Sequence, residues 1–220
     1  MQKKVFNYLR NSIIAKVYLF IIYRFKEFES SSSYWETRYQ KNGNSGRGSY
    51  GESANFKASV INNFVEKHNI QFVDDFGCGD GNQLSLSNYP NYVGYDISET
   101  ILENVRNKFK NDNSKIFFNI LEYSKSNSKL QLALSLDVIY HLVEDQIFAS
   151  HMNQLFDGYM YVIIFSTNFN ETFYNGSHVK HRKFSDWIEK NTSNYELVQV
   201  IHNIDIFSKV NFYIYKKINF

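Results

Sequence analysis

Three glycines at alternate positions, placed directly after an apolar run, constrain this chain of 220 residues more than any other feature. The run 72–76 carries β-branched and aromatic residues, and Gly77, Gly79 and Gly81 follow it. A strand that ends in such a turn and leads into a helix exposes backbone N–H groups to a ligand, because glycine has no side chain to cover them. The spacing differs from the dinucleotide-binding fingerprint G-x-G-x-x-G, since position 82 is not a glycine.

An acidic residue follows the glycines at the distance that a nucleotide site requires. Asp96 ends the short apolar run 92–96 and lies nineteen residues after Gly77. An acid about twenty residues after such a turn, at the tip of the next strand, accepts hydrogen bonds from ribose hydroxyls. The turn and the acid together therefore indicate a ligand with a nucleoside part much more strongly than the glycines alone.

The glycine turn and the run that ends at the acid together resemble the class I methyltransferases that use S-adenosylmethionine (SAM). The resemblance implies that Asp75, Gly77 and Gly79 hold the methionine end of SAM. It also implies that Asp96 and Ile97, at the end of the second strand, bind the ribose side of the cofactor.

The same resemblance extends to two later strands. The run 135–142 looks like the fourth-strand motif of the family, which implies that Leu136 and Asp137 lie beside the methionine end of SAM. At the end of the third strand the family often has an acid, whereas this chain has Asn119. The resemblance places Asn119 or Ile120 near the adenine.

Alternating strand and helix patterns predict a doubly wound α/β sheet of seven strands, the Rossmann-like sheet of that family. The resemblance covers roughly residues 50–217. The expected strands are 72–76, 92–96, 116–120, 130–136, 159–165, 197–201 and 212–216, with the last two closing the sheet as an antiparallel pair. The expected helices are 52–69, 82–89, 99–110, 144–156 and 184–190.

Residues 1–33 are expected to form an N-terminal helical extension that ends at a polar break, Ser30–Ser33. Apolar residues occupy both faces of residues 1–29, and the longest apolar run, 17–23, is too short to span a bilayer. Three interpretations stay open for this segment: a helix packed on the domain, a homodimer contact, or a basic helix lying on a membrane surface.

The domain is expected to cover residues 34–220 and to begin with a segment, 34–51, that we call the lid. Four glycines in nine residues, from Gly43 to Gly51, exclude a stable helix or strand there. A flexible linker is the alternative, but the flanking aromatic and charged residues favour a lid that closes over the cofactor. The run Tyr34–Tyr39 and the loop after it look like a segment of small methyltransferases from bacterial surface-glycan clusters.

Polar side chains crowd directly after the expected fourth strand, where doubly wound folds place their ligands. His141 titrates near neutrality and is the natural general base for an acceptor hydroxyl, and Asp137 is the second catalytic candidate. Tyr140 is expected to contact the acceptor. The alternatives are a packed His141 and acids, Glu144 or Asp145, that cap a helix.

A loop after the expected fifth strand, residues 166–183, contains His178, His181 and Arg182. Two histidines beside cations suit an anionic acceptor, because arginine binds phosphate or carboxylate with two parallel hydrogen bonds. The alternatives are a solvated basic loop and a metal site that shares Asp137. No spacing matches a zinc signature, so we expect no metal.

Composition narrows the class of protein further. The net charge of +2 comes from well-mixed charges, so nothing indicates a nucleic-acid partner. The single cysteine, Cys78, excludes a disulfide framework and suits a reducing compartment. We therefore expect a cytoplasmic protein, with the inner face of the membrane as the second location.

The function that the resemblance implies is that of a SAM-dependent methyltransferase. We expect it to methylate an oxygen of a sugar or sugar-linked phosphate in a surface-glycan precursor, so that its partner is a glycan, phosphate-bearing or other small-molecule acceptor. The glycine spacing disfavours an NAD-dependent oxidoreductase. A methyltransferase for another small molecule or a protein, and a SAM-binding scaffold without catalysis, stay open.

Overall fold

The computed structural model of this protein describes residues 28–125, 129–171, 177–205 and 208–218. The three interpretations of the N-terminal segment concern residues that, up to position 27, lie outside this description. Within the four described ranges, no helix is both long enough and apolar enough to cross a membrane.

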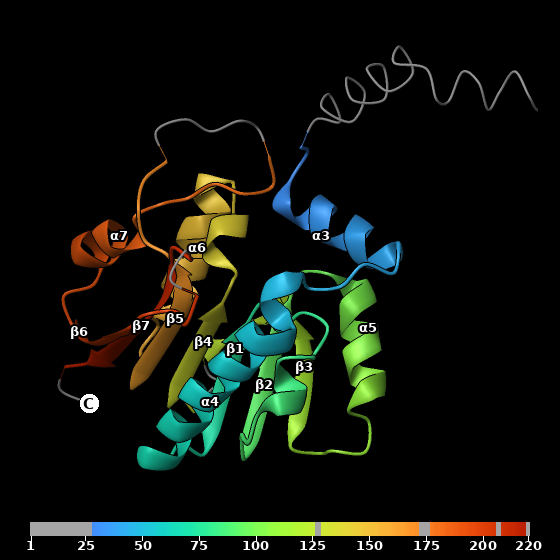
Figure 1. Ribbon diagram of the computed structural model, residues 1–220, viewed down its shortest axis with the longest axis horizontal. Coiled ribbons are helices and arrows are strands. Elements are labelled where there is room, and N and C mark those ends of the chain that lie inside the picture. The colour runs from blue at the N-terminus through green and yellow to red at the C-terminus, as the bar shows by residue number, and fades with distance from the viewer. Residues whose placement is uncertain (1–27, 126–128, 172–176, 206–207, 219–220) are drawn as a thin grey trace, which may run out of the picture.

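A seven-stranded sheet forms the centre of the molecule, in the order β3-β2-β1-β4-β5-β7-β6 (Figure 1). Strands β1 to β5 run parallel, and β7 is antiparallel to its neighbours β5 and β6. The predicted doubly wound sheet is confirmed, and every predicted strand boundary lies within two residues of the observed one. The strands are β1 Phe72–Phe76, β2 Asn91–Asp96, β3 Lys115–Asn119, β4 Leu132–Leu136, β5 Tyr161–Thr167, β6 Tyr195–Ile201 and β7 Val210–Lys217.

Helices cover both faces of the sheet. Helices α4 (Gly51–Lys67) and α5 (Glu99–Lys108) pack on one face, and α6 (Asp145–Leu155) and α7 (Phe184–Asn191) pack on the other. In Figure 1, α4 crosses in front of the central strands. Because both faces are covered, β5 is buried along its whole length, which explains why its sequence is almost continuously apolar.

The predicted crossover helix at 82–89 is wrong. Only a single 3-10 turn, η2 (Leu84–Leu86), connects the glycine-rich turn to β2. The hydroxyls of Ser85 and Ser87 donate to the carbonyls of Gly81 and Gln83, at 2.9 and 3.0 Å. Serine hydroxyls that bond to nearby backbone compete with helical hydrogen bonds, so the segment turns once and stops.

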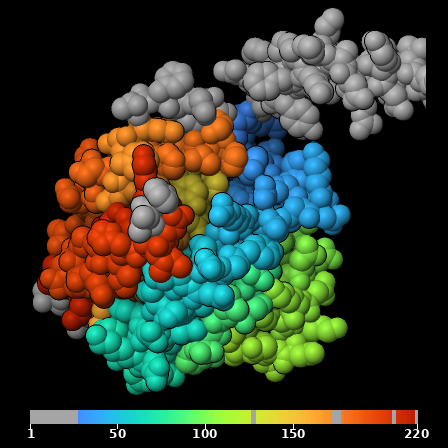
Figure 2. Space-filling view, viewed as in Figure 1, coloured from blue at the N-terminus to red at the C-terminus, as the bar shows by residue number. Residues whose placement is uncertain are grey.

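The serines of the predicted polar break, Ser30–Ser33, start a helix that the sequence did not predict. The Ser30 hydroxyl accepts the N–H of Ser33 at 3.0 Å and caps α3 (Ser31–Gln40). Helix α3 lies above the edge at which the parallel strands end (Figure 1). The space-filling view shows the chain around α3, in blue, against the start of α4 and above α5 (Figure 2). The described residues also form the 3-10 turns η1 (Arg47–Ser49), η3 (Ile120–Glu122) and η5 (Ile139–His141).

Candidate functional site

The glycine turn, residues 77–81, follows β1 directly and bends back over β2. The N–H groups of Gly77 and Cys78 both donate to the carbonyl of Tyr95, at 2.7 and 3.0 Å. Gly79 has a φ of +58° and donates its N–H to Oδ2 of Asp96 at 3.0 Å. The backbone of this turn and the acid at the tip of β2 therefore form one rigid unit.

A cavity of about 490 Å³ lies at the carboxyl ends of β1, β2 and β4, with α3 on its opposite side. Most of the residues predicted for the cofactor line it, as do both catalytic candidates. The predicted residues among the lining are Asp75, Gly77, Gly79, Asp96, Ile97, Ile120, Leu136, Asp137 and His141. The predicted residues outside the lining are Asn119, Tyr140, His178, His181 and Arg182.

Asp75 and Asp96 are both buried in the cavity wall, but their hydrogen bonding differs. Oδ2 of Asp75 accepts the hydroxyl of Tyr92 at 2.9 Å, whereas its buried Oδ1 has no hydrogen-bond partner among the described residues. Burial raises the pKa of Asp75 to about 7, although the Tyr92 hydroxyl and the charge of Lys57 oppose this shift. Each oxygen of Asp96 accepts one backbone N–H, from Gly79 and Ser98, and keeps lone pairs for a ligand.

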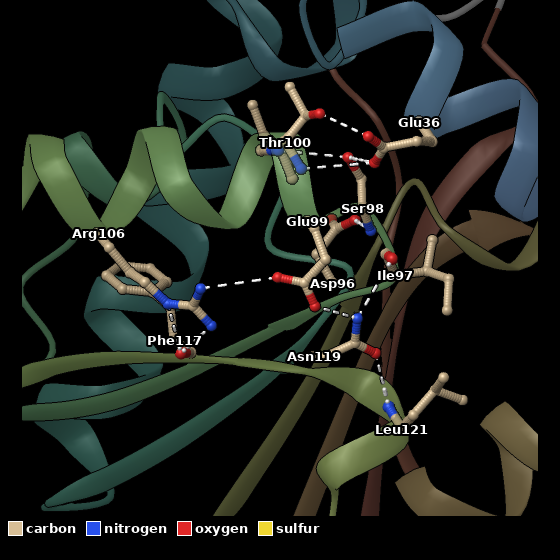
Figure 3. Close-up of polar contacts among 11 residues, drawn as sticks. Glu36, Asp96, Ile97, Ser98, Glu99, Thr100, Arg106, Phe117, Asn119 and Leu121 are labelled. Atoms are coloured by element: carbon tan, nitrogen blue, oxygen red, sulfur yellow. Dashed lines mark hydrogen bonds and ion pairs between the residues drawn. The ribbon is translucent and has the colours of Figure 1, made fainter. Parts of the chain in front are cut away.

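The side chain of Asn119 is engaged outside the cavity (Figure 3). Its amide donates to Glu99 at 2.6 Å, and its carbonyl accepts the N–H of Leu121 at 3.0 Å, which caps η3. Ile120 and Leu121, the next residues along the chain, line the cavity instead. These two apolar side chains therefore form the cavity wall at the carboxyl end of β3.

Lys57 is a residue of the site that the sequence analysis did not single out. It lies on α4 with a side chain that is 1% exposed, and it lines the cavity. Its Nζ is 2.6 Å from Oδ2 of Asp137, while Oδ1 of Asp137 accepts the Tyr140 hydroxyl at 2.8 Å. Each carboxylate oxygen of Asp137 thus accepts one side-chain donor, so Asp137 orients Lys57 and Tyr140.

His141 lines the cavity directly after β4, at the end of η5. Burial lowers its pKa to about 4, so the expectation that it titrates near neutrality is wrong. Its Nδ1 lies 3.2 Å from the carbonyl of His178. Because a carbonyl only accepts, this contact assigns the proton to Nδ1 and leaves a lone pair on Nε2. His141 is therefore a neutral imidazole, and the described residues form no hydrogen bond with its Nε2.

The basic loop, residues 178–182, does not present its predicted groups to the cavity. Arg182 is 12% exposed and donates to the carbonyls of Leu142 and Val143 and to Oδ1 of Asp145. Nδ1 of His181 lies 2.8 Å from the Thr167 hydroxyl. These contacts hold the loop against the start of α6, so the geometry argues against a role of Arg182 in binding an anionic acceptor.

His178 has a different role from the rest of the loop. Its ring stacks on Tyr34 of α3 with centroids 4.1 Å apart, and on His141 with centroids 5.4 Å apart. Trp35 packs edge-on against His141 at 5.0 Å. The rings of α3 and of the basic loop therefore enclose His141 from two sides, which explains its low pKa.

Helix α3 is fastened to both sides of the cavity by carboxylates. Glu36 accepts hydrogen bonds from the hydroxyls of Ser98 and Thr100 at the start of α5 (Figure 3). Glu144, before α6, accepts the N–H and the hydroxyl of Ser31 at 2.8 and 2.6 Å. Burial alone would raise the pKa of Glu144, but the hydrogen bonds from Ser31 outweigh it and lower the pKa. Glu144 is therefore a carboxylate at neutral pH.

The second half of the lid packs against the glycine turn and forms hydrogen bonds with it. The N–H of Ser45 donates to Asp80, and the N–H of Asp80 donates to the Ser45 hydroxyl, both at 2.8 Å. A Cβ on Gly79 would lie 2.4 Å from the Ser45 hydroxyl oxygen, and a Cβ on Gly48 would lie 2.6 Å from Oδ2 of Asp137. The close approach requires glycine at both positions, so the lid is a fitted wall of the cavity and differs from a free linker.

Several residues of the site were not predicted from the sequence. The sequence feature that could have indicated each of them differs from residue to residue. Lys57 shares a helical face with Ile61 and Phe64, so a charged residue within an apolar stripe was the available signal. Trp35 and Tyr39 stand in the aromatic run of the lid, but their spacing could not show that they line the cavity. For Ser31 no local signal existed, because its partner Glu144 is more than a hundred residues away.

Within the described parts of the chain, no group of three or more histidine, cysteine or acidic side chains could hold a metal ion. The metal arrangement considered for His178, His181 and Asp137 does not form there, since the two histidines contact Tyr34 and Thr167 respectively.

No protein-family model and no curated protein sequence matches this chain. Solved structures do. The N-methyltransferase NodS from Bradyrhizobium japonicum WM9, in complex with S-adenosyl-L-homocysteine (SAH), superposes with a TM-score of 0.64 at 10% identity, over 86% of this chain and 99% of that one. Magnesium protoporphyrin IX methyltransferase (ChlM) from Synechocystis PCC 6803 with bound SAM gives 0.61 at 14% identity, over 85% and 97%.

The bifunctional kinase-methyltransferase WbdD gives a TM-score of 0.51 at 19% identity, and the match covers 78% of this chain but only 40% of that longer protein. Identities this low establish an architecture and leave the substrate open. The sheet order, the glycine turn and these similarities lead to one conclusion: this chain has the seven-stranded α/β fold of the SAM-dependent methyltransferases.

Proposed function

We propose that this protein is a SAM-dependent methyltransferase that methylates a hydroxyl oxygen of a neutral sugar, of the kind found in surface-glycan precursors. One observation carries the cofactor assignment. Oδ1 of Asp75 is buried in the wall of the cavity, and no described residue forms a hydrogen bond with it. An unpaired buried acceptor is costly, and a cationic donor from a ligand, such as the α-ammonium of SAM, would satisfy it.

The remaining cofactor residues fit the same ligand. Asp96 keeps free lone pairs at the tip of β2 and would accept the ribose hydroxyls. Ile97, Ile120 and Leu121 offer apolar surface for the adenine. Two structural neighbours were crystallised with SAM or SAH, which supports the same assignment.

When bound, SAM supplies a methyl group on a sulfonium, which is ready for in-line attack. Nε2 of His141 would accept the proton of the acceptor hydroxyl as its oxygen bonds to the methyl carbon, while the bond from that carbon to the sulfonium sulfur breaks and SAH leaves. The hydrogen bond from Nδ1 to the His178 carbonyl holds the imidazole in the required tautomer. Lys57 and Tyr140 hold Asp137 beside it. The lid excludes water and keeps the two reactants aligned, which is the larger part of the catalytic effect.

The charge of the cavity favours a neutral acceptor over a phosphate-bearing one. Among the described lining residues, four are acids and one is a lysine. Glu144 stays ionised at neutral pH, and the hydroxyls of Ser30 and Ser32 line the same mouth. Arg182, the expected anion-binding residue, is engaged elsewhere. A phosphate would meet net repulsion here, whereas sugar hydroxyls can bond to carboxylates and serines. The sugar class itself follows from the resemblance of the Tyr34–Tyr39 run.

The experiment is a coupled assay for SAH release with matched acceptor pairs. Purified protein and SAM are incubated with neutral glycosides and with the corresponding sugar phosphates, and products are checked by mass spectrometry for one added methyl group. We expect turnover with a neutral glycoside and at least about tenfold lower kcat/KM for its phosphate, corresponding to about 1.4 kcal/mol. SAH binding without turnover on any acceptor would instead indicate a scaffold, and no SAM or SAH binding would refute the proposal.

A further inference from the structure

Two buried groups of opposite charge line the cavity. Asp75 is 7% exposed and Lys57 is 1% exposed. They come from different elements, β1 and α4, and the charge of the lysine lowers the pKa of the aspartate. Asp75 has a role in the proposed function as the acceptor for an ammonium. Lys57 has none beyond its contact with Asp137.

Packing alone does not require a lysine at this position. Lys57 lies on the face of α4 that carries the fully buried Ile61, and its Nζ is 5.4 Å from the centroid of the Phe165 ring. An apolar side chain would fill this space without the cost of removing an ammonium from water. Replacing a buried ion pair by apolar residues is often neutral or stabilising. Stability alone therefore does not explain why this buried position carries a lysine.

The ammonium of Lys57 has capacity for a second anion. An ammonium has three N–H donors, and Asp137 is its hydrogen-bond partner among the described residues, at 2.6 Å from Oδ2. Its position in the cavity wall leaves donors available to a ligand. A ligand whose cationic end meets Asp75 would place an adjacent anionic end near this ammonium. An α-amino acid has that pair of charges on one carbon.

We propose that Lys57 binds the α-carboxylate of the methionine part of SAM, opposite the α-ammonium at Asp75. This inference rests on the proposed function and assigns the one lysine in the described cavity lining to a cofactor subsite. The arrangement also explains how a cavity with four acids accepts a carboxylate. Lys57 supplies the local positive charge, and Asp137 holds its ammonium in place.

Isothermal titration calorimetry with three ligands tests this assignment without relying on turnover. SAH carries both charged groups, its decarboxylated analogue lacks the carboxylate, and 5′-methylthioadenosine lacks both groups. The wild-type protein should bind SAH about 10- to 100-fold more tightly than the decarboxylated analogue, the range for one charge-assisted contact. Lys57→Met keeps most of the length of the side chain without its charge, and it should abolish that difference while leaving 5′-methylthioadenosine affinity unchanged.

The controls separate a binding role from a structural one. Lys57→Met leaves Asp137 without its cation, so the double variant Lys57→Met/Asp137→Asn keeps the site neutral if the single variant does not fold. Lys67→Met changes an exposed lysine of the same helix and should have no effect on any ligand. Thermal unfolding monitors folding of each variant.

The outcomes are distinguishable from one another. If the wild-type protein binds none of the three ligands, the proposed function itself fails. If it binds SAH no more tightly than the decarboxylated analogue, the assignment of Lys57 is overturned, whatever the variants do. An equal loss of affinity for all three ligands in the neutral double variant would also overturn it, because it would show a structural role.

Discussion

The cofactor side and the acceptor side of the cavity differ in what supports them. On the cofactor side, Asp75, Gly79 and Asp96 stand at strand ends or in the turn directly after a strand. On the acceptor side, the basic loop reaches the site from a long connection between β5 and α7, and Arg182 turns toward the backbone near α6. Most residues predicted for the first region line the cavity, with Asn119 as the exception, whereas the residues predicted in the basic loop do not line it.

The difference teaches which positions a fold determines. In a parallel sheet all strands end at one edge, so the order of strands alone brings their tips together. A loop has no such constraint, and its side chains take whichever partners are nearest. For Arg182 those partners are the carbonyls of Leu142 and Val143, which lie before the first turn of α6. A cationic loop near a site is therefore weak evidence for an anionic substrate.

The largest expected effect lies where the two sides meet, at His141. His141→Gln should lower kcat about 100-fold with little change in KM, the low end of general-base contributions, because a base with a low pKa is weak. Protonation removes the lone pair of Nε2, so wild-type kcat should fall as the pH drops through about 4, the pKa of the buried ring. The kcat of the variant should not show this decrease at low pH. A variant with reduced kcat but an unchanged pH profile would show that His141 is not the base.

The next effect belongs to the cofactor side. Asp96→Ala should weaken SAH binding by about 1–3 kcal/mol, or roughly 5- to 150-fold, because the ribose loses its acceptor and the Gly79 N–H loses its partner. Calorimetry measures the affinity. Asp96→Asn is the matched control, since its carbonyl can keep one backbone hydrogen bond and should lose less affinity. Unchanged binding in the alanine variant would mean that the strand tip does not hold the ribose.

A smaller effect, on stability and not on ligand binding, is expected on the acceptor side. Arg182→Ala should destabilise the protein by about 1–3 kcal/mol, because two backbone carbonyls and Asp145 lose a charged donor. The melting temperature should fall by about 2–4 °C per kcal/mol in a chain of this length. SAH affinity and acceptor KM should change less than about twofold.

Arg182→Lys should keep only part of the stability that Arg182→Ala loses, because one ammonium cannot replace the several fixed N–H donors of a guanidinium. A tenfold rise in acceptor KM at an unchanged melting temperature would reverse the interpretation. It would return Arg182 to the substrate and favour a phosphate-bearing acceptor.

The sequence was sufficient for the sheet and for the strand ends that meet at the cavity, for a physical reason. Strand ends and glycine turns are local patterns, and β1 with its turn follows them closely. The short η2 could not be predicted from periodicity, because two serine hydroxyls decide it. The pairing of Ser31 with Glu144, and the direction of Arg182, depend on contacts between distant segments. A sequence pattern within a short window does not indicate such contacts.

The smallest expected effect concerns stability and returns to the cofactor side. Burial raises the pKa of Asp75 from an ordinary value of 3.8 to about 7 in the folded protein. Between these two values the folded state binds more protons than the unfolded state, so stability falls as the pH rises from about 4 to about 7. At higher pH the full cost of a buried, half-paired carboxylate is present. Asp75 thus lowers the stability of the ligand-free protein.

Asp75→Asn removes this cost, because an amide stays neutral and its oxygen can still accept the Tyr92 hydroxyl. We expect the variant to melt a few degrees above the wild type at pH 8, using about 2–4 °C per kcal/mol, with the difference shrinking toward pH 4. Glu66→Gln, at an exposed acid on α4, should show no such trend. SAH should stabilise the wild type more than the variant, since only the carboxylate pairs with the α-ammonium. Equal stabilisation of both proteins by SAH would separate Asp75 from the cofactor and leave its burial as a purely structural cost.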